Sequence, residues 1–334
     1  MMTLNKSLSP FLIALAAGVA LLALLSSSIA DAASPSSLIS VDREKFVFRD
    51  AKNRSRIFHG TNYVNKGGDF IPGVDENITN LLAYMGMNAV RLGVMLPGLF
   101  PTPDGKPRVA YLDHIENIVD MLWSKGIYSV IDLHQDVLGA TICGEGTPEW
   151  MWNVSELHAL DFPEPMAFSN TSKPGPDGGY SPAPNCAARG IAKLIGWSGF
   201  YMTDASGKAF SQLYQGTSTI GKYVALYWKI VSKRFSGHPG ILFYELLNEP
   251  WLGDHVGDPL LLLKGGEAER KAVGPYMKKM ESIVHENDPL TPVLFSPGEL
   301  NNRLMRSVGY DEGFLSGNPM AFHVYCVVGT DGPG

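Results

Sequence analysis

Short apolar runs alternate with longer stretches of helical period from residue 55 onward. In the longer stretches apolar residues recur at three- and four-residue spacing, which predicts helices over residues 74–85, 111–125, 220–235 and 267–287. The short runs are typical of buried strands, which we expect at residues 55–62, 88–94, 127–136, 241–250, 292–298 and 320–326. This alternation predicts an α/β fold, a (β/α)8 TIM barrel with about six of the eight βα units in this chain.

The alternating pattern lapses between residues 139 and about 215, where Gly, Pro, Ser and Asn are frequent. A stretch this long without periodicity is usually a functional insertion, and we expect it to form a lid or a substrate subsite. A disordered linker between two domains is the alternative. Five aromatic residues argue against a linker: Trp150, Trp152, Trp197, Phe200 and Tyr201.

The N-terminus has the order of a signal peptide. Lys6 precedes an apolar stretch over residues 11–25, and small residues follow at Ala30 and Ala32. The stretch is shorter than the roughly 20 residues that cross a bilayer, so we favour secretion over a membrane anchor. We expect a signal peptide over residues 1–33 and a single barrel domain over residues 34–334, incomplete at its C-terminus.

Secretion permits disulfides and glycosylation. Cys143 and Cys186 bracket the insertion and are a candidate pair, which leaves Cys326 without a partner. Four acceptor sequons follow the signal, at Asn53, Asn77, Asn153 and Asn170. The net charge of −6, with no long basic run, excludes a nucleic-acid-binding function. We also expect the protein to be a monomer.

Polar side chains follow the predicted strands at the points where the strands end. Because the carboxyl ends of barrel strands meet at one face, these side chains form a candidate site. They are Asn62, Asn65, Lys66, Arg91, His134, Gln135, Asp136, Asn248, Glu249, His323 and Tyr325. Within "NEP", Glu249 suits general acid and base catalysis, because apolar surroundings would raise the pKa of its carboxyl. Alternatively, the tripeptide only ends a strand.

Other kinds of site find little support in the sequence. Asp132, His134 and Asp136 alternate and would suggest a metal site only if the strand stayed regular through the loop, so we expect no metal. The sequence has no nucleophile elbow, zinc-protease motif, phosphate-binding loop or dinucleotide fingerprint. We therefore expect no cofactor.

Four motifs in order carry a family resemblance: "VRLG", "VIDLHQD", "LLNEP" and "HVY". Together they resemble the retaining β-glycosidases of glycoside hydrolase family 5. The long insertion after "IDLHQD", a lysine in the first loop and a cysteine after "HVY" are most similar to the endoglycoceramidases, secreted enzymes that release the whole glycan from glycosphingolipids. The resemblance covers about residues 40–330.

The resemblance implies roles for most of the candidate residues. Glu249 corresponds to the acid/base and Asn248 to its sugar-binding neighbour. His134, His323 and Tyr325 match the active-site shell, with Tyr325 beside the nucleophile and Arg91 holding that carboxylate. Lys66 and Asp136 match contacts to the first sugar. The family's nucleophile is a glutamate at the end of strand seven, so we expect it to be absent from this chain; Glu245 and Glu299 do not occupy its position.

These observations predict a secreted retaining endo-β-glycosidase that hydrolyses the bond between oligosaccharide and ceramide. The expected partner is a glycosphingolipid or another β-glycoside, with transient contact at a membrane surface or micelle. Two alternatives stay open, a related β-glucanase or β-glucosidase and a non-catalytic glycan-binding fragment. We expect the 334-residue chain alone to be inactive, because it supplies one carboxyl group of the required pair.

Overall fold

The computed structural model describes residues 39–152, 197–304, 306 and 308–324 of the 334-residue chain. At its centre lies a parallel sheet of five strands in the order β4-β5-β6-β7-β8. The strands are β4 (Gly60–Tyr63), β5 (Ala89–Gly93), β6 (Tyr128–Asp132), β7 (Ile241–Glu245) and β8 (Val293–Leu294). Each strand lies beside the next one in sequence, which is the strand order of a βα barrel.

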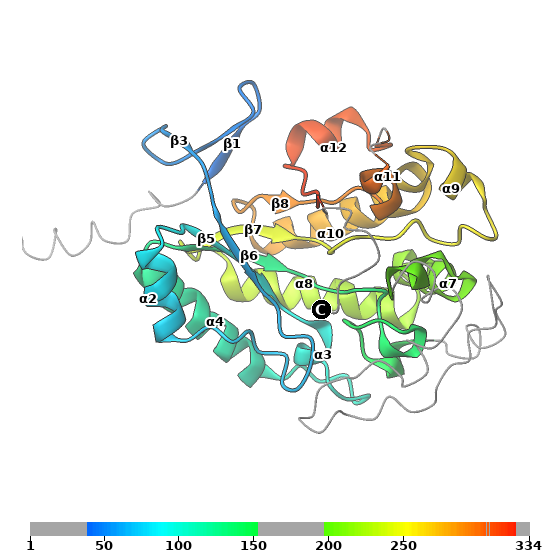
Figure 1. The fold of residues 1–334 in the computed structure, drawn as a ribbon, viewed down its shortest axis with the longest axis horizontal. Coiled ribbons are helices and arrows are strands. Elements are labelled where there is room, and N and C mark those ends of the chain that lie inside the picture. The colour runs from blue at the N-terminus through cyan, green and yellow to red at the C-terminus, as the bar shows by residue number, and fades with distance from the viewer. Residues whose placement is uncertain (1–38, 153–196, 305, 307, 325–334) are drawn as a thin grey trace, which may run out of the picture.

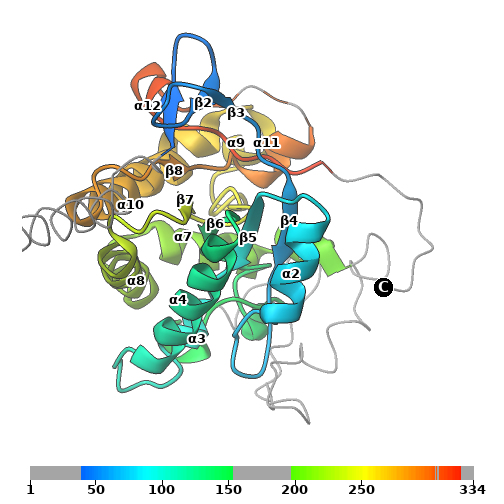
Figure 2. The ribbon, with the colours of Figure 1, turned by 90° about the vertical axis from the view of Figure 1, so that its left-hand side faces the viewer.

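Four helices lie along the outer side of the curved sheet (Figures 1 and 2). They are α2 (Glu76–Tyr84), α4 (Val109–Ser124), α8 (Thr219–Phe235) and α10 (Gly274–Asn287). Asp75 caps α2 by accepting a hydrogen bond from the Ile78 amide, and Ser218 caps α8 through the Gly221 amide. All four helices fall within two or three residues of the predicted ones, except that a π-helical turn, η5 (Glu269–Val273), precedes α10.

The main core fills the space between the sheet and these helices. Leu92, Ile131 and Tyr244 of the strands pack there with helical side chains such as Leu122 and Trp228, all fully or almost fully buried. Because strand side chains alternate between faces, the neighbours of these core residues point to the inner side of the sheet. Polar groups gather on that inner side at the carboxyl ends of the strands.

The predicted insertion contains regular structure at both of its described ends. It includes three short 3-10 helices, η2 (Ala140–Ile142), η3 (Glu149–Met151) and η4 (Trp197–Met202), and the helix α7 (Asp204–Tyr214). The prediction of an irregular segment up to residue 215 is therefore wrong for its last part. Thr203 caps α7, and Ala205, Ala209 and Leu213 form a buried stripe at helical spacing. Cys186, the predicted partner of Cys143, lies outside the described residues.

The first predicted strand, residues 55–62, is divided in two. β3 (Ser55–Arg56) belongs to a separate sheet, and β4 begins only at Gly60. The side chain of Asn88 causes the break, because it accepts from the His59 amide and donates to the Ile57 carbonyl. A Cβ at Gly60 would lie 1.6 Å from the Ala89 carbonyl oxygen, so only glycine at this position lets the backbone of β4 lie this close to that of β5.

The sixth predicted strand, residues 320–326, is not a strand in the part that the structure describes. The described part of this segment pairs with the sheet only through one parallel bridge, between Phe295 and Met320. The Phe295 amide donates to the Pro319 carbonyl and the Ala321 amide donates to the Phe295 carbonyl. Proline has no amide hydrogen, so the ladder cannot begin earlier at Pro319. Residues 325–334 lie outside the described range.

A small antiparallel sheet precedes the barrel strands and was not predicted. Its strands are β1 (Ser40–Asp42), β2 (Val47–Arg49) and β3. Phe48 of β2 packs on Phe58 and on Phe243 of β7, with ring centroids 5.7 and 5.1 Å apart. The remaining short helices are α3 (Leu96–Leu99), α9 (Leu260–Leu263), α11 (Glu299–Arg303) and α12 (Glu312–Gly317).

Candidate active site

An arginine whose side chain is 15% exposed lies at the centre of the inner polar face. Arg91 Nε donates to Glu245 Oε2 at 2.6 Å, and its Nη2 donates to Glu245 Oε1 at 2.9 Å. The same Nη2 lies 3.0 Å from Asp132 Oδ2. Asp132 and Glu245 are register partners on β6 and β7, which places both carboxylates beside the guanidinium. Burial lowers the pKa of Arg91, but the two carboxylates outweigh burial and raise it, so the cation is kept.

Arg91 also fixes the orientation of Asn248. Its Nη2 donates to Asn248 Oδ1 at 2.8 Å, and Asn248 Nδ2 donates to the carbonyl of Gln135 at 2.8 Å. An amide held at both ends cannot flip, so the oxygen faces Arg91 and the nitrogen faces the loop after β6. The sequence analysis rejected Glu245 as the nucleophile, because it does not occupy the family's position, and gave it no other role. The structure shows that Glu245 holds Arg91 and acts on Asn248 through it.

Glu249 has a strained backbone. Its φ is 39°, in the left-handed region, although it is not glycine and precedes Pro250, which favours extended backbone at the residue before it. Such strain costs on the order of 1–3 kcal/mol and is typical of functional sites. Gln135 holds this turn, because its Nε2 donates to the carbonyls of Asn248 and Glu249 at 2.6 and 3.1 Å. β7 has already ended at Glu245, so "NEP" is not needed to end the strand.

His323 contacts the carboxyl group of Glu249. Its Nδ1 lies 2.6 Å from Glu249 Oε1, and Asn302 Nδ2 donates to the His323 carbonyl at 2.9 Å. The hydrogen bond to Glu249 raises the pKa of His323, while burial opposes the increase. This contact places a titratable imidazole within hydrogen-bond distance of the Glu249 carboxyl group, the geometry that proton transfer requires. The two side chains line a narrow cleft together with Ser296, Pro297, Glu299, Asn302, Ala321 and Phe322.

His134 links Asp132, the last residue of β6, to Asp136 in the loop that follows. Its Nδ1 lies 2.7 Å from Asp132 Oδ2, and its Nε2 lies 3.3 Å from Asp136 Oδ2. Burial disfavours the imidazolium, but the two carboxylates outweigh burial and raise the pKa of His134 to about 9. Burial likewise raises the pKa of Asp136, but His134 and Lys66 outweigh it and lower this pKa to about 2. At neutral pH the loop therefore carries a fixed imidazolium.

Lys66, from the loop after β4, reaches two acids of the loop after β6. It forms ion pairs with Asp136 and, at 2.9 Å, with Glu145. Glu145 is a residue that sequence reasoning missed. It lies close to Asp136 because the two residues exchange backbone hydrogen bonds of 2.8 and 2.7 Å as an antiparallel bridge. No periodicity or motif in the sequence marks this bridge.

Of the eight residues to which the resemblance assigns roles, seven form a continuous set of contacts. The set runs from Lys66 through Asp136, His134, Arg91 and Asn248 to Glu249 and His323, with Asp132 as the link between His134 and Arg91. The eighth, Tyr325, lies outside the described residues. Among the residues that the structure places, no group of three or more His, Cys, Asp or Glu side chains has the arrangement of a metal site.

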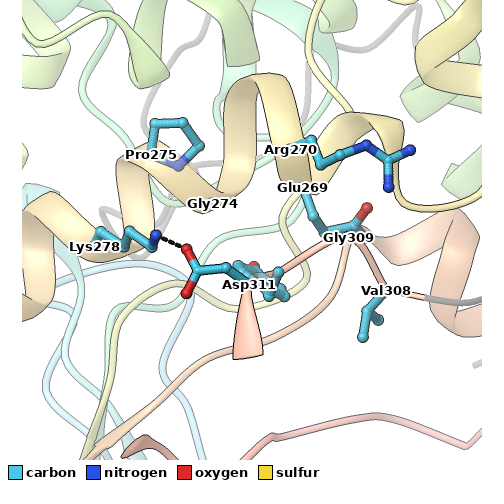
Figure 3. Close-up of a pocket in the computed structure, with 9 residues that line it drawn as sticks. Glu269, Arg270, Gly274, Pro275, Lys278, Val308, Gly309 and Asp311 are labelled. Atoms are coloured by element: carbon cyan, nitrogen blue, oxygen red, sulfur yellow. Dashed lines mark hydrogen bonds and ion pairs between the residues drawn. The ribbon is translucent and has the colours of Figure 1, made fainter. Parts of the chain in front are cut away.

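A separate cavity of about 430 Å³ lies beside η5 and α10. Figure 3 shows Arg270, Lys278 and Asp311 around it, with Lys278 paired to Asp311. Glu269, which also lines it, accepts from the Gly298 amide and from Asn301 Nδ2 at 2.8 and 2.9 Å. This cavity is formed by the outer helical layer rather than by the strand ends, so we do not place the chemistry there. None of the helices in the described ranges combines the length and hydropathy of a bilayer span.

The comparisons agree with this geometry. The family model for cellulase, glycosyl hydrolase family 5, matches residues 51–171. Residues 51–171 therefore resemble a family 5 cellulase domain. An endoglycoceramidase from Cyanea nozakii is 34% identical over 247 residues, which cover 72% of this chain and 47% of that protein. An endoglycoceramidase from Hydra vulgaris is 34% identical over 268 residues, which cover 77% of this chain and 49% of that protein. The resemblance to family 5 and to endoglycoceramidases is confirmed.

A solved structure shares the fold. Endo-glycoceramidase II from Rhodococcus sp., in complex with ganglioside GM3, has a TM-score of 0.58 at 22% identity over 78% of this chain and 54% of that chain. Together with the parallel sheet and its outer helices, this likeness confirms the prediction of a (β/α)8 barrel fold. The chain spans about half the length of the curated relatives that it matches.

Proposed function

We propose that the protein is a secreted retaining endo-β-glycosidase that hydrolyses the bond between oligosaccharide and ceramide in glycosphingolipids. The contact between Glu249 and His323 is the observation that carries the proposal. It places a buried carboxyl group, on a strained backbone, against a titratable partner at the carboxyl edge of a barrel sheet. The names of the curated relatives from Cyanea nozakii and Hydra vulgaris support the substrate class.

Each placed residue has a role in this reaction. Glu249 gives its proton to the leaving oxygen as general acid and later removes a proton from water as general base. Asn248 Nδ2 faces away from Arg91 and donates a hydrogen bond to a sugar hydroxyl. The imidazolium of His134 and the ammonium of Lys66 lower the pKa of Asp136, so this carboxylate accepts hydrogen bonds from sugar hydroxyls, while Arg91 holds the side chains of Glu245 and Asn248.

A retaining mechanism needs a second carboxyl group about 5–5.5 Å from the first. We assign none among the described residues. Glu245 is held by Arg91, and Asp136 and Glu145 are held by Lys66. The proposal is therefore made for the protein produced from its complete transcript.

The test compares Glu249→Gln with the unchanged protein on two substrates. The alcohol of a lipid glycoside is a poor leaving group and needs a proton from the acid. The dinitrophenolate of a dinitrophenyl β-lactoside leaves without one. We expect hydrolysis of the glycolipid to fall by a factor of about 10² to 10⁴ and the first step on the aryl glycoside to be much less affected.

Glu116→Gln is the matched control, because Glu116 is also an acid paired to a cation but lies on α4 against Arg234 of α8. It should keep both activities. An equal loss on both substrates in Glu249→Gln would contradict an acid/base role.

A further inference from the structure

Three side chains at the mouth of the site form a small charged group, which we call the Lys66 triad: Lys66, Asp136 and Glu145. The ammonium of Lys66 lies between the two carboxylates, 2.9 Å from Glu145 Oε1 and in contact with Asp136. The side chain of Lys66 is 45% exposed, whereas those of Asp136 and Glu145 are 7% and 22% exposed. The cation is therefore at the opening, and the acids lie beneath it.

The backbone fixes the separation of the two acids. Asp136 and Glu145 form an antiparallel bridge that closes the turn between them. Gly144 permits the closure, because a Cβ there would lie 2.1 Å from the Asp136 carbonyl oxygen. Two acids on a rigid bridge give the long, flexible lysine side chain one preferred position, which lowers the entropy that it loses when a ligand binds.

A buried imidazole nitrogen lies beside the same acid. The side chain of His134 is 8% exposed, and its Nε2 is paired with Asp136 Oδ2 at 3.3 Å without the geometry of a hydrogen bond. A bound group that supplies a well-formed hydrogen bond to this nitrogen gains affinity. A sugar hydroxyl both donates and accepts, and therefore fits between an ammonium, an imidazole nitrogen and two carboxylates.

We infer that Glu145 is a positioning residue for Lys66, which together with Asp136 matches the family's contacts to the first sugar. This inference rests on the proposed function for the identity of the ligand as a glycan. Glu145 shares the ammonium with Asp136 and keeps it over the opening, so that Lys66 donates to the hydroxyl oxygen while Asp136 accepts the hydroxyl hydrogen. Without Glu145 the ammonium would lose one of its two anchors and turn toward Asp136 or solvent.

Steady-state kinetics of Glu145→Gln test this role. The lost anchor weakens one charge-assisted hydrogen bond to substrate, which we expect to raise KM about tenfold while kcat changes less than twofold. Lys66→Met should raise KM at least as much, and Glu145→Gln should add less than twofold in the Lys66→Met background, because Glu145 acts through Lys66. Glu116→Gln is again the control, since it should leave both constants unchanged.

Binding of phenyl thio-β-lactoside, which is not hydrolysed, separates this inference from the proposed function. If the unchanged protein binds this glycoside about ten times more tightly than Glu145→Gln but hydrolyses no glycolipid, the triad stands and the proposed function fails. If the protein hydrolyses glycolipid and Glu145→Gln keeps the same KM and Kd, the inference fails alone. Additive effects of the two substitutions, or no binding to either protein, would also overturn it.

Discussion

Replacing Arg91 by lysine probes the interaction that holds the inner face together. Arg91 makes two hydrogen bonds to Glu245, one to Asn248 and an ion pair to Asp132. A lysine keeps the charge but presents a single ammonium in place of the planar fork, so we expect at least two of these contacts to be lost. Hydrogen bonds to charged groups contribute about 1.5–3 kcal/mol each, so the loss of stability should be at least about 3 kcal/mol.

Urea unfolding of the protein from the complete transcript measures this loss as a shift of the barrel transition at constant slope. Arg91→Met should cost about 3–5 kcal/mol, because it leaves Glu245 and Asp132 as buried charges without their cation. Arg234→Lys is the matched control. Arg234 also contacts two acids, Asp113 and Glu116, but all three side chains are substantially exposed, so its loss should stay below about 1 kcal/mol.

The reasoning fails if Arg91→Lys and Arg234→Lys lower stability equally, or if Arg91→Lys costs less than about 1 kcal/mol. A second readout concerns the site itself. Because Arg91 orients Asn248, Arg91→Lys should lower kcat on a β-lactoside even at temperatures where the variant remains folded.

Two further predictions concern charge and processing. The pKa of His134 is raised from 6.5 to about 9, so the stability that its imidazolium contributes is complete below pH 6.5 and is lost as the pH rises through 9. Over about 2.5 pH units this contribution amounts to about 3 kcal/mol. His134→Gln should therefore flatten the pH dependence of the free energy of unfolding between pH 6.5 and 9. If that dependence is unchanged in His134→Gln, another group is responsible. If the protein is secreted, its mature N-terminus should begin near Ala33, and N-terminal sequencing that finds Met1 on the exported protein would contradict the signal-peptide prediction.

The sequence predicted those parts of the fold that depend on periodicity. Helices α4 and α8 have long apolar stripes, and strands β5 to β7 are short apolar runs, so their types and order could be read directly. The small sheet β1–β3 could not, because its strands are two or three residues long and its cohesion comes from Phe48 packing on the distant Phe243. The predicted first strand is divided into β3 and β4 at residues 57–59 because the side chain of Asn88, rather than a neighbouring strand, forms the hydrogen bonds to the backbone there.

The candidate site divides in the same way. Residues at strand ends, such as Glu249 and Lys66, could be predicted because parallel strands bring their carboxyl ends to one face. Gln135, Glu145 and Glu245 could not be assigned roles in this way. Gln135 acts on backbone carbonyls, Glu145 depends on an isolated bridge, and Glu245 acts through Arg91. Contacts of these kinds depend on the folded backbone rather than on the spacing of residues along the chain.

Product analysis tests the central claim most directly. The protein from the complete transcript would be incubated with ganglioside GM3 in detergent, beside Glu249→Gln, and the water-soluble products would be identified by mass spectrometry with the anomeric form followed by NMR. The account predicts release of the intact oligosaccharide with retention at the new reducing end, and no such release by Glu249→Gln. Release of single glucose units only, inversion of configuration, or equal release by Glu249→Gln would contradict it.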